Sequence, residues 1–456
     1  MGLGQLQWLL IGEHMSLPCY YTIGGLNFKN GFVTSCPQQH EKMQILDDAW
    51  LPSEFYNNEL FRKHRLEMMR GEWSAGCDMC EHVEKARAGK SMRQELDADL
   101  THYNSETGEV DFAGLKTVEI RFSHSCNMAC LHCSQVFSSG WMKKLKEYTP
   151  DDEDHKHQLH QLTGRMHRSS VDDDFTMQIS TKRALEIAED LNKNFPNLER
   201  IDFAGGEVLY QKQFLPTLEK LSEHPNAENI KIIFHSNFNA DFDPEALSFL
   251  LKKFGYCNIM ISVDAGPKLY PYFRQGDWNK LKQNIEKFKA VDNKHSDVNL
   301  VCTTSVYQLM EFEDVMRGFM SLECDYVNCS IVYTPAYLNP SVLMLKHRSF
   351  VLNELERARN AVLMIDKERR NNILETKNMD NFVFDEVMNY GHWTDVFSAL
   401  KAIEQVREYV LNHQAEHKHY TAFEKYISKS DDLWKQNFND HIDSFRYSNG
   451  ELKINV

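Results

Sequence analysis

Strand-like and helix-like segments alternate through the middle of this chain. Short apolar runs rich in β-branched residues recur, and longer segments with helical spacing separate them. This alternation favours an α/β fold with a parallel sheet or barrel, because parallel neighbours need a crossover connection. The expected helices are 182–194, which Ser180 would cap, and 244–254, 278–290 and 311–322. The expected strands, six in number and thus too few for a closed eight-stranded barrel, are 117–123, 201–203, 230–234, 259–263, 298–302 and 326–332.

The chain on either side of this α/β core has a different pattern. Before the core, Tyr20-Tyr21-Thr22-Ile23 is expected as a strand and 53–70 as a helix. After Pro340 the chain is expected to be mostly helical. We therefore expect three regions: a small α+β domain over 1–114, the α/β core over 115–340 with a charged insert at 142–175, and a helical region over 341–456.

Three cysteines lie together directly after the first core strand. Cys126, Cys130 and Cys133 have the spacing C-x3-C-x2-C. Three thiolates on one loop can hold a cubane iron–sulfur cluster and leave the fourth iron without a protein ligand. Zinc is the alternative, because His132 or His124 would complete a four-ligand site. The spacing alone leaves both metals open.

A glycine pair follows the next expected strand. Gly205 and Gly206 would let the backbone approach a ligand closely, and Glu207 offers an acceptor. Alone, this stretch is equally typical of an ordinary turn. However, the cysteine loop and the glycine pair follow consecutive strands, and a βα barrel builds its active site at such strand ends.

With these two motifs the chain resembles the radical S-adenosylmethionine (radical SAM) enzymes over about residues 115–335. The resemblance implies a partial (βα)6 barrel. It implies that Cys126, Cys130 and Cys133 bind a 4Fe–4S cluster whose open iron is chelated by S-adenosylmethionine (SAM). One-electron reduction would then cleave SAM to a 5′-deoxyadenosyl radical, which abstracts a hydrogen from the substrate.

The resemblance also implies residues that bind SAM. Gly205, Gly206 and Glu207 match the motif that holds the methionine amino group. In this family an aromatic residue usually precedes the third cysteine and packs near adenine, whereas this chain has His132, whose flat ring would replace it.

Four further polar residues are candidates for SAM binding because they lie at or after strand ends. They would bind the ribose hydroxyls or the carboxylate of SAM, and they are equally expected as turn and cap residues. These candidates are Ser236, Ser262, Asp264 and Arg274, with Asn237 beside the first.

A second group of cysteines lies near the N-terminus. Cys19, Cys36, Cys77 and Cys80 make a four-thiolate set, which suits either zinc or an iron–sulfur cluster. The pattern resembles the twitch, or half-SPASM, module of radical SAM enzymes, in a variety that precedes the barrel, and the stretch 65–72 is also similar to that variety. The resemblance implies an auxiliary 4Fe–4S cluster, with structural zinc as the alternative.

The other four of the eleven cysteines, Cys257, Cys302, Cys324 and Cys329, are expected to fill the core.

The first residues carry no Lys or Arg and do not resemble a signal peptide, so we expect reduced thiols and a cytoplasmic protein. No stretch has the length of apolar residues that a membrane crossing needs. With 51 basic and 66 acidic residues the net charge is −15, which argues against a nucleic-acid-coating protein.

Taken together, the motifs predict a radical SAM enzyme, and we expect a peptide or protein side chain as its substrate. A low-potential donor such as flavodoxin or ferredoxin would supply the electron. One alternative is a radical SAM dehydrogenase that acts on a small alcohol or sugar. An alternative of another class is a zinc-stabilised binding protein without catalytic activity.

Overall fold

The computed structural model describes residues 18–29, 32–37, 51–86, 91–134, 137–147, 178–333, 335–376 and 393–455. Most of the charged insert expected at 142–175 lies outside these residues. The chain divides into two compact units. The first comprises Met1–His124, Asp173–Phe234 and Ala246–Cys257, and the second comprises Ser125–Asp172, His235–Glu245 and Asn258–Val456. Among the described helices, none has both the length and the apolar character to cross a membrane.

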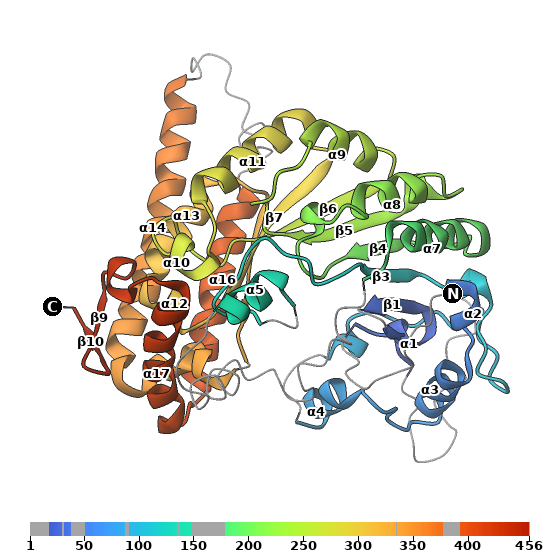
Figure 1. Ribbon diagram of the computed structural model, residues 1–456, viewed down its shortest axis with the longest axis horizontal. Helices are drawn as coiled ribbons and strands as arrows, with labels where there is room; N and C mark the ends of the chain where they lie inside the picture. The colour runs from blue at the N-terminus through green and yellow to red at the C-terminus, as the bar shows by residue number, and fades with distance from the viewer. Residues whose placement is uncertain are drawn as a thin grey trace. The chain divides into compact units, whose positions relative to one another are not determined.

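The fold is α/β, and its main sheet has the strand order β2-β1-β3-β4-β5-β6-β7-β8 (Figure 1). All six strands expected from the sequence are present. The pairings β1–β3, β3–β4, β4–β5 and β7–β8 are parallel, and β1–β2 is antiparallel. The strands are β1 Gly25–Lys29, β2 Phe32–Thr34, β3 Thr117–Arg121, β4 Arg200–Phe203, β5 Lys231–Ser236, β6 Tyr256–Ser262, β7 Ser296–Thr304 and β8 Tyr326–Ile331.

In the first unit the N-terminal strands extend the predicted sheet, because β1 pairs with β3. The prediction of a strand over 20–23 is wrong: Tyr20–Gly24 forms the short helix α1. The amide of Ile23 donates to the carbonyl of Cys19 at 3.0 Å, and residues 21–24 are all buried instead of alternating. The other helices with residues in this unit are α2 Pro52–Phe55, α3 Glu59–Met69, α4 Asp78–Ala86, α7 Thr181–Asn194, α8 Phe214–Leu221 and α9 Pro244–Leu251, with 3-10 turns η1 Met92–Gln94, η2 Phe112–Gly114, η4 Val208–Tyr210 and η5 Ala227–Asn229.

Helix α7 shows how the sequence pattern produces the layer that covers this part of the sheet. As predicted, the Ser180 side chain caps the helix by accepting a hydrogen bond from the Arg183 amide at 3.2 Å. The apolar residues recur at helical spacing, and Ala184, Ile187 and Leu191 are buried on one face.

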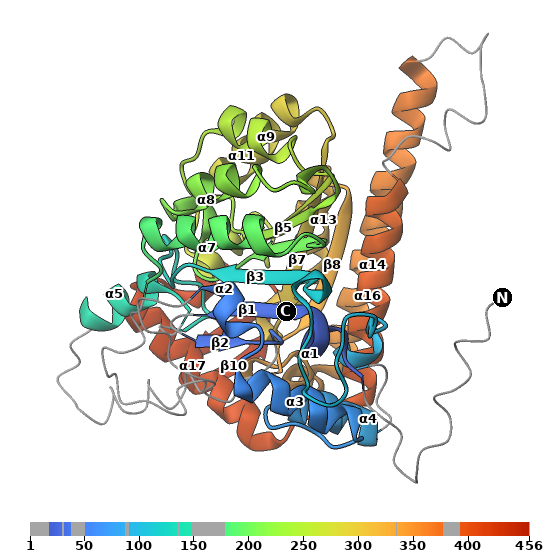
Figure 2. The same ribbon diagram turned by 90° about the vertical axis from the view of Figure 1, so that its right-hand side faces the viewer.

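The second unit contains β7, β8 and most of the C-terminal helices. Helices α14 and α16 lie side by side in both ribbon views (Figures 1 and 2). The chain after the last helix forms a hairpin that the sequence analysis missed, although Asn449-Gly450, both at positive φ, is a typical hairpin turn. The elements are α5 Ser139–Glu147, α10 Tyr270–Arg274, α11 Trp278–Asp292, α12 Val306–Met310, α13 Phe312–Ser321, α14 Met344–Thr376, α16 Trp393–Asn412, α17 His417–Trp434, β9 Phe445–Ser448 and β10 Glu451–Ile454, with 3-10 turns η6 Ala336–Leu338, η7 Pro340–Leu343 and η9 Phe438–Asp440.

The expectation that four cysteines fill the core is confirmed. Cys257, Cys302, Cys324 and Cys329 are all buried. Cys302 of β7 and Cys329 of β8 are direct partners in the sheet register.

A buried arginine organises the N-terminal part of the first unit. The guanidinium of Arg65, on α3, donates to the carbonyls of Thr22 at 3.1 Å and Tyr56 at 2.8 Å, and to Oδ1 of Asn57 at 2.9 Å. It also lies 4.6 Å from the centre of the Tyr56 ring. Burial lowers the pKa of Arg65 to about 10, although the side chain remains a cation at neutral pH. One side chain therefore ties α1 to α3.

We predict that Arg65→Lys lowers the free energy of unfolding of this unit by about 2 kcal/mol, because an ammonium cannot reach all three acceptors at once. Urea unfolding of the purified protein measures this change. Arg70→Lys, at the residue directly after α3, is the matched control, because Arg70 is exposed and should change little. Equal effects of the two variants would contradict the role of Arg65.

Candidate functional site

The three cysteines of the C-x3-C-x2-C motif lie in an irregular loop that follows β3 in the chain and belongs to the second unit. The amide of Cys133 donates to the carbonyl of Cys130 at 2.9 Å, which closes a tight turn. The thiol of Cys130 is buried and lies 3.4 Å from the carbonyl oxygen of Arg274. Burial raises the pKa of this thiol to about 12 in the metal-free protein.

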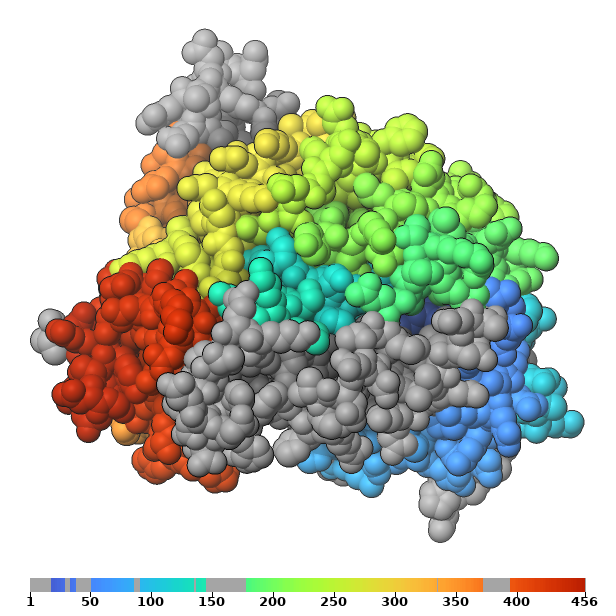
Figure 3. Space-filling model, in the orientation of Figure 1, coloured from blue at the N-terminus to red at the C-terminus, as the bar shows by residue number. Residues whose placement is uncertain are grey.

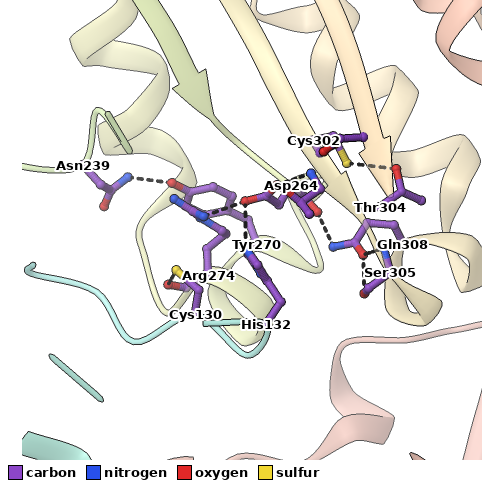
Figure 4. Close-up of polar contacts among 12 residues, drawn as sticks. Cys130, His132, Asn239, Asp264, Tyr270, Arg274, Cys302, Thr304, Ser305 and Gln308 are labelled. Carbon is purple, nitrogen blue, oxygen red and sulfur yellow. Dashed lines mark hydrogen bonds and ion pairs between the residues drawn. The ribbon is translucent and has the colours of Figure 1, made fainter. Parts of the chain in front are cut away.

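Arg274, at the end of α10, forms a buried ion pair beside this loop. Its Nη1 lies 2.6 Å from Oδ2 of Asp264, and the two side chains are 7% and 2% exposed (Figure 4). Burial by itself lowers the pKa of Arg274, but Cys130 and Asp264 outweigh burial and raise the pKa above its ordinary value. Cys126 contributes in the same direction. The guanidinium therefore supplies positive charge next to two of the three thiols.

The backbone of Asp264 has an uncommon conformation. This residue follows β6 with a φ of 56°, in the left-handed region that most residues avoid. Its Oδ1 accepts a hydrogen bond from the amide of Thr303 at 2.6 Å, and Gln308 donates to its backbone oxygen (Figure 4). These contacts fix the carboxylate that in turn orients Arg274.

His132 extends the same group of residues. Its Nε2 lies 3.7 Å from Oδ2 of Asp264, and its ring stacks on Phe273 with a centroid distance of 5.0 Å and an interplanar angle of 13°. One face of the imidazole is thus covered by Phe273.

Residues after β5 also form hydrogen bonds with the cysteine loop. Asn237 donates to Oδ1 of Asn127 at 2.8 Å, and Asn127 donates to the carbonyl of Asn239 at 3.1 Å. The hydroxyl of Ser236 accepts the amide of Phe238 at 2.9 Å, so this candidate serves a turn in the structure. Ser262, another candidate, is half-buried at the end of β6.

The glycine pair lies in the first unit, at the end of β4. Gly205 and Gly206 have φ values of 84° and 57°, which glycine adopts without strain. A Cβ on Gly205 would lie 3.1 Å from Cβ of Arg121, so the backbone also passes close to β3. Glu207 is buried, and its Oε1 accepts the amide of Leu209 at 3.0 Å.

Gln211 supports the glycine turn and was not found from the sequence. It is buried, its Nε2 donates to the carbonyl of Gly205 at 2.8 Å, and its Oε1 accepts from the hydroxyl of Ser123 at 3.2 Å. A lone glutamine after a strand carries no sequence signal, because its partners are set only by the fold.

Residues 120–322 match the model of the Radical SAM superfamily. This chain is thus similar to radical SAM proteins over residues 120–322. It is 24% identical over 190 residues to GTP 3′,8-cyclase of Clostridium botulinum, and this match covers 39% of the chain and 56% of the relative. The chain therefore spans about half the length of the curated relatives that it matches.

Two solved structures are also similar. One is anSMEcpe with bound AdoMet, at 17% identity and a TM-score of 0.33, covering 47% of this chain and 52% of that one. The other is Streptococcus suis SuiB bound to S-adenosylmethionine, at 12% identity and a TM-score of 0.29, covering 65% and 62%.

The four N-terminal cysteines come together outside the residues that match the Radical SAM model. Cys19, Cys36, Cys77 and Cys80 all line one cavity of about 390 Å³, which includes its open mouth. Burial and the three other thiols raise the pKa of Cys77 to about 12, while Cys19 is almost fully buried. The rest of the lining includes Met68, Trp73, Met92 and Arg93.

No group of three His, Cys, Asp or Glu side chains among the described residues is arranged to hold a metal ion directly. The atoms of the three-cysteine loop can still be compared with the ligands that an iron–sulfur cluster needs. Three soft thiols lie on one loop beside a buried cation, and the Nε of Arg274 has no hydrogen-bond partner among the described residues. Such a site fits an anionic iron–sulfur cluster with its ligand.

We predict that Asp264→Asn lowers the free energy of unfolding by about 3 kcal/mol, because it leaves the buried Arg274 without its counter-charge. Asp241→Asn is the matched control, since the carboxylate of Asp241 pairs with Lys280 in solvent, and it should give no measurable change. Thermal or urea unfolding of both variants checks this. A stable Asp264→Asn protein would show that the ion pair does not organise the loop.

Proposed function

We propose that this radical SAM enzyme holds a 4Fe–4S cluster through Cys126, Cys130 and Cys133 and reductively cleaves SAM. When bound, the cluster and SAM supply one-electron chemistry that yields a 5′-deoxyadenosyl radical for hydrogen abstraction from a substrate. The main support is that the loop of the three cysteines lies against Arg274, whose carbonyl oxygen is 3.4 Å from the thiol of Cys130. The guanidinium of Arg274 lowers the pKa of Cys130 and so favours its thiolate, although burial outweighs this effect in the metal-free protein.

The surrounding residues would position these groups. Asp264 fixes Arg274, and the Nε of Arg274, which has no hydrogen-bond partner in the described part of the chain, is available to an anionic acceptor. We propose that the ring of His132, which stacks on Phe273, packs near adenine as the resemblance implies. We also propose that Gly205, Gly206 and Glu207 bind the methionine amino group and that the main sheet is an open (βα)6 barrel.

For the N-terminal cysteines we propose an auxiliary 4Fe–4S cluster. The support is that all four thiols, Cys19, Cys36, Cys77 and Cys80, line one cavity. Structural zinc remains the alternative, because four thiolates suit either group.

The proposed substrate is a peptide or protein side chain, as expected from the resemblance of the N-terminal cysteine set to a twitch module. A small alcohol or sugar is the alternative. Flavodoxin or ferredoxin in the cytoplasm would deliver the electron.

Anaerobic reconstitution tests the central proposal. We predict that the iron-loaded protein releases 5′-deoxyadenosine from SAM only when dithionite is present, and that Cys130→Ala abolishes this product. Cys324→Ala is the matched control, because Cys324 is a buried thiol of the core, and it should retain the activity. An iron-loaded wild-type protein that forms no deoxyadenosine would contradict the proposal.

Metal analysis tests the second cluster. We predict about eight irons per wild-type chain and about four in a Cys77→Ser/Cys80→Ser variant, since each 4Fe–4S cluster holds four. The variant should still cleave SAM, because Cys126, Cys130 and Cys133 are unchanged. One zinc and about four irons in the wild type would instead support the structural zinc site.

A further inference from the structure

The loop that carries the three catalytic-motif cysteines has no regular secondary structure, so its backbone oxygens need partners from elsewhere. Four successive carbonyls each accept a hydrogen bond from a side chain. The hydroxyl of Ser138 donates to Met128 at 2.6 Å, Nε1 of Trp434 donates to Ala129 at 3.1 Å, Nε1 of Trp141 donates to Cys130 at 2.8 Å, and the hydroxyl of Tyr426 donates to Leu131 at 2.7 Å.

Three of these four donors are large aromatic side chains, Trp141, Tyr426 and Trp434, which we call the aromatic clamp. They are only 0%, 1% and 5% exposed. The rings of Trp141 and Trp434 meet edge to face with their centroids 4.5 Å apart. Rings packed this tightly have little freedom, so their polar tips point in fixed directions toward the loop.

The clamp comes mostly from the C-terminal helical region. Tyr426 and Trp434 both lie on α17, eight residues apart, which places them on one face of the helix. Trp141 lies on α5, and the space-filling view shows this green-blue segment next to the red C-terminal residues (Figure 3).

The start of α5 approaches the same loop very closely. A Cβ on Gly140 would lie 2.5 Å from the carbonyl oxygen of Met128, so only glycine fits there. The loop is therefore held between the first turn of α5 and one face of α17.

We propose that Trp141, Tyr426 and Trp434 are positioning residues that hold Cys126, Cys130 and Cys133 in place for the cluster. This inference rests on the proposed function for the nature of the cluster. It assigns a role to α17: the helix supplies part of the wall of the cluster site. The clamp satisfies the loop's carbonyls with buried donors, so it also excludes the water that would otherwise hydrate them.

Tyr426→Phe and Trp434→Phe test this role in the full-length protein. The matched control is Tyr420→Phe, on the same helix and equally buried, because the hydroxyl of Tyr420 meets Nε2 of His347 at 2.8 Å instead of the loop. The first measurement is the rate at which iodoacetamide alkylates Cys130 in the metal-free protein, followed by mass spectrometry.

We expect alkylation of Cys130 to be about fivefold faster in Tyr426→Phe and Trp434→Phe, because each loses one buried hydrogen bond to the loop. Tyr420→Phe should match the wild type at Cys130. Equal rates in all four proteins, or the same acceleration in the control, would overturn the proposal.

The second measurement separates this inference from the proposed function. In reconstituted protein, the electron paramagnetic resonance spectrum of the reduced cluster should change in Tyr426→Phe and remain as in the wild type in Tyr420→Phe. If the wild-type protein takes up no iron at the three cysteines, the proposed function is ruled out. The alkylation rates would still show whether the clamp holds the loop. An unchanged spectrum in a fully iron-loaded Tyr426→Phe protein would contradict the positioning role.

Discussion

The buried ion pair between Arg274 and Asp264 connects the elements that form the candidate site. Two charges removed from water are costly, and only close geometry with further hydrogen bonds compensates for their desolvation. The structure provides both: the pair distance is 2.6 Å, and Thr303 and Gln308 hold Asp264 from β7 and α12. Because the backbone oxygen of Arg274 also lies against the thiol of Cys130, the position of the pair and the position of the cysteine loop depend on each other.

The loop itself illustrates a general constraint on ligand-bearing loops. The segment that carries these three thiols forms neither a helix nor a strand, so groups from elsewhere must pair its backbone oxygens. Here α5 and α17 supply indole and phenol donors to the loop's backbone oxygens, and the side-chain amide of Asn237, after β5, donates to the side-chain oxygen of Asn127. The cysteine ligands therefore depend on residues from most of the second unit, including its C-terminal end.

Local patterns predicted much of this architecture. The six core strands, the Ser180 cap and the burial of Cys302 follow from spacing and residue type, and these predictions are confirmed. The strand predicted at 20–23 was wrong because its β-branched residues favour a strand locally. In the structure these residues form a helix that is buried and accepts a hydrogen bond from Arg65. The clamp could not be predicted, since Tyr426 and Trp434 meet carbonyls 295 and 305 residues away, and no local signal marks such a pair.

We propose that the three thiols of the loop hold a cluster with one iron open to SAM. Electron paramagnetic resonance of the dithionite-reduced Cys77→Ser/Cys80→Ser protein tests it most directly, because that variant isolates the site at Cys126, Cys130 and Cys133. We expect a 4Fe–4S signal whose g values shift when SAM is added, since SAM becomes a ligand of the cluster. A signal that SAM leaves unchanged, or the absence of any cluster signal in the reconstituted variant, would contradict it.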